Sequence, residues 1–178
     1  MKPSPISEHD HVDGPANALV TLIEYGDYEC PFCVKAYPAI ESVRAAFRGK
    51  IRFVYRHVPK SAAAGFAKQA AEASEFAASQ GKFWGMHAVL SLHHDRHDID
   101  HLVEAAKAIG LDPEACRKAL VDRTFAERVR ELAVASVRSG IVGTPTLFIN
   151  GTRYKDRIED GPLRAAITRE LEAAHLLN

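Results

Sequence analysis

The sequence predicts an α/β domain in which a mixed central sheet, flanked by helices, is interrupted by an inserted all-helical subdomain. Two short stretches rich in β-branched residues enclose an amphipathic stretch, and β-like stretches return only near the C-terminal end. The residues between them are rich in alanine and follow helical spacing. We therefore expect a flexible N-terminal tail (1–14), an α/β domain formed by 15–60 and 141–178, and a helical insertion (61–140).

The first predicted unit is a strand, a helix and a second strand in succession. Residues 18–25 form a nearly continuous apolar run, as expected of a strand buried on both faces. From residue 31 to 47 the apolar positions recur at intervals of three and four, which is the spacing of an amphipathic helix. Residues 51–56 alternate and indicate the second strand. Together they predict a βαβ unit.

The insertion is predicted to contain four or five helices. Gly81, Gly110 and Asp122 mark breaks in the helical pattern. Asp98 or Asp100 is suited to cap one helix, and Asp112 followed by proline is suited to begin the next. Aromatic residues at the start of the insertion are expected to form its core rather than a substrate groove; they are Phe83 and Trp84, with Met86 beside them.

The C-terminal part predicts a hairpin followed by a helix. Residues 146–149 form a strand, Asn150-Gly151 is a pair favoured in type I′ turns, and residues 152–154 begin the return strand. A final helix is expected at about 161–174. This order of elements, strand-helix-strand, inserted helices, then strand-strand-helix, is that of a thioredoxin fold with a helical insertion.

Composition excludes several classes of function. The 178-residue chain has 23 Lys and Arg against 23 Asp and Glu, so it lacks the basic surface expected of proteins that bind nucleic acid or anionic membranes. The start has no apolar signal-peptide region, and no later segment is long enough to insert into a membrane. As it stands, the sequence predicts a cytoplasmic protein; a leader removed before Met1 would instead place it in the periplasm or outside the cell.

The most informative motif is Cys30-Pro31-Phe32-Cys33, which follows the first strand and begins the first helix. Unpaired N–H groups at a helix N-terminus favour a thiolate, and such placement lowers a cysteine pKa from about 8.5 to about 3.5–7.5. Pro31 suits the first turn, where its missing N–H costs nothing. We expect Cys30 to be the exposed attacking sulfur and Cys33, one turn deeper, the resolving sulfur.

Two other interpretations of the cysteine pair stay open. A C-x-x-C pair can supply half of a structural zinc site, but the remaining cysteine is the isolated Cys116, and no second pair exists. The pair can also be a structural disulfide or two inert thiols, although its position between strand and helix favours redox chemistry. Cys116 lies in an apolar-periodic segment and is expected to be an inert buried thiol.

The second informative motif is Gly143-Thr144-Pro145-Thr146. A proline directly before a strand is often an ordinary trans residue. In a thioredoxin-like fold, however, this loop lies beside the cysteine pair, so we expect a cis Thr144–Pro145 bond that leaves the Thr144 backbone free to pair with an extended substrate.

The chain resembles the DsbA-like branch of the thioredoxin superfamily, in particular its shorter bacterial members known as thiol:disulfide oxidoreductases. Three segments carry the resemblance: Glu24 to Cys33 (EYGDYECPFC), Gly81 to His87 (GKFWGMH) and Gly143 to Gly151 (GTPTLFING). The resemblance implies that Cys30 is the nucleophile, Cys33 the resolving cysteine and Pro145 the cis proline that helps to place substrate. It implies disulfide exchange with protein thiols, with no cofactor, and with a thiol system or glutathione as redox partner.

Two departures from periplasmic DsbA leave the redox direction open. DsbA has histidine where this chain has Phe32, and phenylalanine cannot donate to sulfur, so we expect a less depressed Cys30 pKa and a more reducing couple. Thr144 is closer to the residue that disulfide isomerases carry before their proline. We expect Pro31, Phe32, Thr144 and Pro145 to contact the substrate.

Glu24 is an unusual residue for the middle of a buried strand, because burial of a lone carboxylate is costly and raises its pKa. It precedes Cys30 by six residues. In thioredoxin-like proteins a buried acid precedes the nucleophilic cysteine by the same interval. We hypothesise that Glu24 moves a proton to or from Cys33. The alternative is a partly exposed glutamate paired with a nearby lysine or arginine.

The segment from His93 to His101 is a weaker candidate for function. Its histidines at 93, 97 and 101 would share one face of a helix and could bind a metal, but its Asp and Arg content favours an exposed connection. No metal is therefore assigned. Two other functions remain as alternatives: a glutathione-linked transferase or isomerase, which normally lacks a resolving cysteine, and a non-catalytic redox-sensing binding module.

Overall fold

The structure is a computed structural model that describes residues 2–59, 66–92 and 98–176, and it has the predicted thioredoxin fold with inserted helices. The strands are β1 (His11–Asp13), β2 (Val20–Gly26), β3 (Ile51–His57), β4 (Thr146–Ile149) and β5 (Thr152–Arg153). The helices are α1 (Pro31–Ala46), α2 (Phe66–Ser79), α3 (Phe83–Leu92), α4 (Ile99–Ala108), α5 (Pro113–Val121), α6 (Ala126–Arg138) and α7 (Asp160–Leu176).

The sheet mixes parallel and antiparallel neighbours, as predicted. Its strand order is β1-β3-β2-β4-β5, with β2 parallel to β3 and antiparallel to β4. The β4–β5 hairpin turns at Asn150 and Gly151, whose φ angles of 47° and 79° are both positive, as a type I′ turn requires. The sequence pair Asn-Gly was therefore a sufficient signal for this turn.

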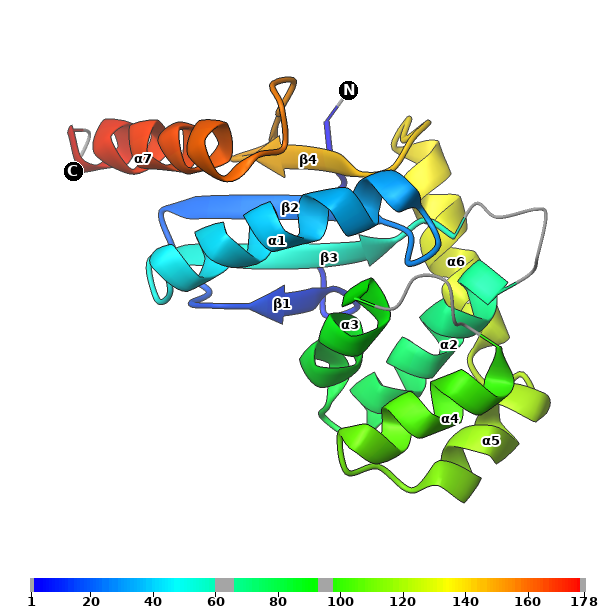
Figure 1. Cartoon of the computed structure of the whole chain (residues 1–178). Coiled ribbons are helices and arrows are strands. Elements are labelled where there is room, and N and C mark those ends of the chain that lie inside the picture. Colours follow the sequence, from blue (N-terminus) through cyan, green and yellow to red (C-terminus); the bar gives the residue numbers. More distant parts are fainter. Residues whose placement is uncertain (1, 60–65, 93–97, 177–178) are drawn as a thin grey trace.

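Each face of the sheet contributes to a separate cluster of buried apolar side chains. Along β2, Leu22 and Glu24 point to one face, and Ile23 and Tyr25 point to the other, because strand side chains alternate. The face with Glu24 is covered by α1 and α7, which lie along the sheet in Figure 1. Helix α1 begins with the cysteine motif, so this face places Glu24 beneath it.

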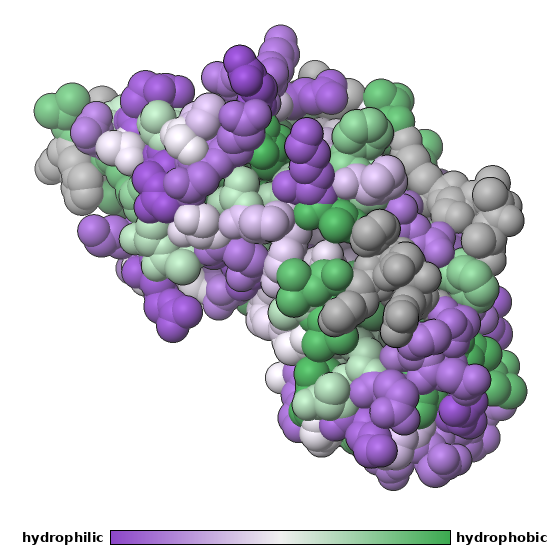
Figure 2. Space-filling model, in the orientation of Figure 1, coloured by the Kyte–Doolittle hydropathy of each residue, from purple (hydrophilic) through white to green (hydrophobic). Residues whose placement is uncertain are grey.

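The inserted helices α2 to α5 gather beside the β1 edge of the sheet (Figure 1). Asp98 and Asp112 cap α4 and α5 as predicted, each accepting two backbone N–H bonds. The aromatic start of α3 is core, also as predicted: Phe83 and Met86 are buried, and Trp84 packs against them. Figure 2 shows hydrophobic residues gathered over α3, below α1. The boundaries assigned to the insertion stay a prediction.

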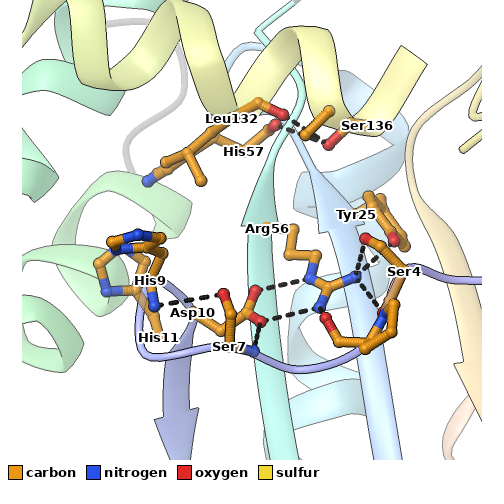
Figure 3. Close-up of polar contacts among 12 residues, drawn as sticks. Ser4, Ser7, His9, Asp10, His11, Tyr25, Arg56, His57, Leu132 and Ser136 are labelled. Carbon is orange, nitrogen blue, oxygen red and sulfur yellow. Dashed lines mark hydrogen bonds and ion pairs between the residues drawn. The ribbon is translucent and has the colours of Figure 1, made fainter. Parts of the chain in front are cut away.

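The N-terminal segment is fixed to the domain, which corrects the prediction of a flexible tail over residues 1–14. Strand β1 pairs antiparallel with β3. The buried guanidinium of Arg56 donates to both carboxylate oxygens of Asp10, at 2.6 and 2.8 Å, and to the carbonyls of Ser4 and Pro5 (Figure 3). The segment is polar and contains few apolar residues, and its partner Arg56 is distant in sequence. The local sequence pattern therefore does not predict this attachment.

Candidate active site

Cys30 occupies the N-cap of α1, where the motif was predicted to place it. Its carbonyl accepts the first helical hydrogen bonds, from the backbone N–H groups of Cys33 at 2.9 Å and Val34 at 3.1 Å. Pro31 is the first helical residue. The Cys30 side chain is partly exposed, whereas Cys33 is only 8% exposed. One sulfur is therefore accessible to a substrate, and the other lies behind it.

The second motif lies against the first. The Thr144–Pro145 peptide bond is cis, as predicted. The Cys30 sulfur lies 3.2 Å from the Thr144 carbonyl oxygen, to which its thiol donates a hydrogen bond when it is protonated. Residues separated by more than a hundred positions in sequence thus meet at one point, which confirms that the loop before β4 adjoins the cysteine pair.

The two cysteine thiols have opposite tendencies to ionise. A hydrogen bond from the Cys33 thiol is the largest cause that lowers the pKa of Cys30, to about 5, with further lowering by the Thr144 side chain and by the N–H groups at the helix start. Burial opposes this effect. The pKa of Cys33 is raised well above its usual range, first because its thiol donates to Cys30 and second because it is buried. At neutral pH the thiolate is therefore on Cys30.

Glu24 is buried, which rules out the partly exposed alternative. It lies beside Tyr55 of β3 and Leu147 of β4 in the sheet register, and only 4% of it is exposed. Burial raises its pKa to about 8, an effect that the positive charge of Arg44 partly offsets and that the charge of Cys30 increases. A carboxyl with this pKa can both hold and release a proton near neutral pH.

Glu24 and the resolving cysteine both line a cavity of about 10 Å³. Its lining includes Glu24, Cys33, Tyr28, Tyr55 and Asp27. The volume is close to the minimum that holds one water molecule, which needs polar partners of the kind this lining provides. Glu24 and Cys33 therefore border the same small space, which has room for about one water molecule.

The tyrosines and Asp27 behind the cysteines were not predicted as parts of the site. The ring of Tyr55 closes the cavity because Gly26 has no side chain: a Cβ there would lie 2.5 Å from the ring. Tyr28 reaches the same cavity, and its hydroxyl contacts His87 Nδ1 at 3.1 Å. The sequence holds one usable signal, the glycine at the end of the first strand, but it does not reveal the strand register.

The front of the site is apolar. Phe32 is 70% exposed, although it lies between the two cysteines, and Val142, just before the cis-proline loop, is 76% exposed. An exposed phenylalanine beside a reactive sulfur is suited to contact apolar parts of a substrate. The roles assigned to Pro31, Phe32 and the Thr144–Pro145 pair in substrate binding stay predictions.

The remaining candidates are Cys116 and the proposed histidine face. Cys116 is fully buried, and burial raises its pKa to about 11, as expected of an inert thiol. Of the proposed histidine face, His93 and His97 lie outside the described residues. His101 is in α4, where its ring contacts Asp98.

Comparison with known proteins agrees with this geometry. A family model described as Thioredoxin matches residues 7–169. The oxidised crystal structure of BdbD from Bacillus subtilis is 26% identical and superimposes with a TM-score of 0.85, covering 96% of this chain and 97% of that one. The structure of α-DsbA1 from Wolbachia pipientis, at 19% identity, shows the same fold with a TM-score of 0.82 over 97% of this chain and 95% of that one.

One group of relatives is much longer than this chain. The Na(+)/H(+) antiporter NhaA 3 of Salinispora tropica is 38% identical over 169 residues, which are 95% of this chain but 26% of that protein. The chain thus spans about a quarter of the length of the curated relatives it matches. Among the residues that the structure describes, no helix combines the length and apolar character needed to cross a membrane. Because the family model covers nearly the whole chain, the protein belongs to the thioredoxin family, and its fold is that of BdbD and α-DsbA1.

Proposed function

We propose that the protein is a thiol:disulfide oxidoreductase that exchanges disulfides with protein substrates through Cys30 and Cys33. The observation that carries the proposal is the accessible Cys30 sulfur at a helix N-terminus, with its pKa lowered to about 5, 3.2 Å from the carbonyl before a cis proline. The accessible thiolate supplies the nucleophile, and the buried Cys33 supplies the group that ends the reaction.

The reaction in the reducing direction has two exchange steps. The Cys30 thiolate attacks one sulfur of a substrate disulfide, forms a mixed disulfide and releases the other substrate sulfur as a thiolate, which takes a proton from water. Cys33 then loses its proton and attacks the Cys30 sulfur; the Cys30–Cys33 disulfide forms, and the second substrate thiolate leaves. Two electrons pass to the substrate. Oxidation of a dithiol substrate reverses these steps.

Glu24 is suited to accept the Cys33 proton at the moment when a base is needed. While Cys30 is a thiolate, its negative charge is one cause of the raised Glu24 pKa. Formation of the mixed disulfide removes that charge, so the Glu24 carboxylate becomes more stable just before Cys33 must be deprotonated. The small cavity that both residues line supports this proposal, because a water there would be able to carry the proton.

The substrate is proposed to be an extended protein segment that carries a cysteine. The backbone of Thr144 borders the Cys30 sulfur, so a segment lying along this loop would present its own sulfur at the point of attack. The exposed faces of Phe32 and Val142 would contact its apolar side chains. A thiol system or glutathione would then restore the starting redox state.

The pKa of Cys30 also bears on direction. A value of about 5 lies between those of thioredoxin, about 7, and DsbA, about 3.5. Stabilisation of the thiolate favours the reduced form, so we propose a couple with a potential between about −270 and −120 mV, the values of those two proteins. Equilibration of the purified protein with glutathione buffers measures this potential, and a value outside the interval would contradict the assignment.

Catalysis is tested by the reduction of insulin disulfides with three single variants. Cys30→Ser should abolish turnover, and Cys33→Ser should abolish turnover but accumulate a mixed disulfide through Cys30. Cys116→Ser is the matched control and should keep normal turnover, because Cys116 is buried away from the site. Turnover that survives Cys30→Ser would refute the proposal. If turnover requires glutathione and the Cys33→Ser variant keeps that turnover, the glutathione-linked alternative would be favoured.

A further inference from the structure

Three side chains that commonly bind metal ions meet outside the active site. They come from three separate elements: His11 from β1, His57 from β3 and Glu75 from α2. Their ligand atoms, one from each residue, all lie within 4.8 Å of one another. Glu75 Oε1 is 2.6 Å from His11 Nε2 and 3.2 Å from His57 Nε2. Both imidazoles thus direct the same nitrogen toward one carboxylate oxygen.

The cluster is enclosed by protein. His57 and Glu75 are buried, and His11 is nearly so, with its ring stacked on Phe83 at a centroid distance of 3.5 Å. Figure 3 shows His11 on the attached N-terminal segment.

We propose that His11, His57 and Glu75 bind one divalent transition-metal ion, with Zn²⁺ as the preferred species. Two histidines and one glutamate form a known zinc ligand set. Tetrahedral zinc with bonds of about 2.0–2.1 Å holds neighbouring ligand atoms about 3.3 Å apart. The His57–Glu75 distance of 3.2 Å already matches that geometry. The His11–Glu75 distance of 2.6 Å must widen by about 0.7 Å to meet it.

The required movement falls on the part of the cluster that can adjust. His11 belongs to a three-residue strand at the edge of the sheet, whereas His57 and Glu75 are held in β3 and α2. A water molecule would complete the coordination. The Ser74 hydroxyl lies 3.2 Å from His57 Nε2, close enough to hydrogen-bond to that water. Arg128 Nε, 3.5 Å from Glu75 Oε2, contacts the oxygen that the two histidines do not share.

The same three residues also form a hydrogen-bonded triad without metal, in which both imidazoles donate to Glu75. The two arrangements differ in one measurable property, which is stoichiometric uptake of a transition-metal ion. A bound ion would tie β1 to β3 and α2, and so would join the N-terminal segment to the inserted helices. It would raise thermal stability with no part in the thiol exchange itself.

Metal uptake is best measured on the double variant Cys30→Ser/Cys33→Ser, because thiolates would otherwise bind the probe. We expect titration with Co²⁺ to give the visible absorption of a four-coordinate ion and to saturate at one equivalent, with Zn²⁺ displacing it. Zn²⁺ should raise the melting temperature, whereas Ca²⁺ and Mg²⁺, which prefer oxygen ligands, should not. Absence of stoichiometric uptake by this folded protein would overturn the proposal.

A matched pair of histidine variants then locates the ion. In the same background, His11→Asn should weaken Co²⁺ binding more than about 100-fold, since loss of a ligand exceeds the effect of losing an outer partner. His101→Asn, a half-exposed histidine in α4, should leave binding unchanged. Unchanged binding in His11→Asn, or equal loss in both variants, would overturn the assignment to this cluster. Circular dichroism of each variant shows that a loss of binding is not a loss of fold.

Discussion

Replacement of Glu24 by glutamine removes an ionisable group from the centre of the sheet at nearly constant volume. In the native protein, burial raises the Glu24 pKa from 4.5 to about 8. The unfolded chain therefore gives up this proton at a much lower pH than the folded protein does. Between these two pKa values the folded state binds more protons than the unfolded state, so a rise in pH lowers the free energy of unfolding. Glu24 therefore destabilises the fold progressively as pH rises from 4.5 toward 8.

The magnitude follows from these two pKa values. One pKa unit corresponds to about 1.4 kcal/mol, so the cost of Glu24 approaches about 5 kcal/mol above pH 8 and is about 3 kcal/mol at pH 7. Below pH 4.5 both states hold the proton, and the cost disappears. Glu24→Gln should therefore gain about 3 kcal/mol of stability, relative to wild type, on going from pH 4.5 to pH 7.

Urea denaturation under reducing conditions, at several pH values between 4.5 and 8, measures this difference. Glu104→Gln removes an exposed carboxyl from α4 and is the matched control; its stability should stay within about 0.5 kcal/mol of wild type throughout. A Glu24→Gln effect that does not change with pH would refute the argument that Glu24 is held protonated by burial.

The same variant tests the proton path. Without a carboxylate near Cys33, decay of the mixed disulfide should slow on the order of 100-fold, while its formation through Cys30 changes little. Quenched-flow measurement of a labelled mixed disulfide separates these two steps. An unchanged decay rate with an unchanged pH profile would remove Glu24 from the mechanism.

Three further predictions concern the thiol pair and the N-terminal segment. Titration of the Cys30 thiolate by its absorbance at 240 nm should give a midpoint near pH 5, and Cys33→Ala should raise that midpoint by removing the main hydrogen-bond donor; a midpoint above pH 8 in the native protein would contradict the geometry. Phe32→His should lower the midpoint further and make the couple more oxidising in a glutathione titration, and an unchanged potential would contradict this reasoning. Asp10→Asn leaves the buried charge of Arg56 without its partner and should cost about 3–5 kcal/mol in denaturant unfolding, whereas a neutral effect would show that the contact is not needed.

Local chemistry accounts for the parts of the fold that could be predicted from sequence. The Asn150-Gly151 turn, the Asp112 cap and the Cys30 cap each depend on a few adjacent residues whose backbone preferences are intrinsic. The buried strand β2 follows from a continuous apolar run, which no exposed element would carry. The position of the cysteine pair could also be predicted from local sequence, because the strand before it and the helix after it each show their own pattern.

Contacts between residues that are distant in sequence account for the parts of the fold and the site that could not be predicted. Attachment of the N-terminal segment depends on Arg56, 46 residues beyond Asp10, and strand β1 is too short and polar to show a pattern of its own. The cavity behind Cys33 depends on the register of β2 and β3, which brings Tyr55 beside Glu24. Register is set by packing across the sheet and leaves no signature in either strand alone.

The site is organised so that its acidic groups do not all ionise at once. The charge of Cys30 raises the pKa of Glu24, and the charge of Glu24 raises that of Cys33, because all three groups share a partly dehydrated space at the start of α1. The helix N-terminus and the Cys33 hydrogen bond assign the first negative charge to Cys30. In the proposed reaction, exchange would consume that thiolate, and the site could then accept a charge again, first on Glu24 and then on Cys33. In the proposed mechanism, disulfide exchange at the surface would thereby be coupled to proton transfer in the interior, and the stability lost to the buried carboxyl would serve that coupling.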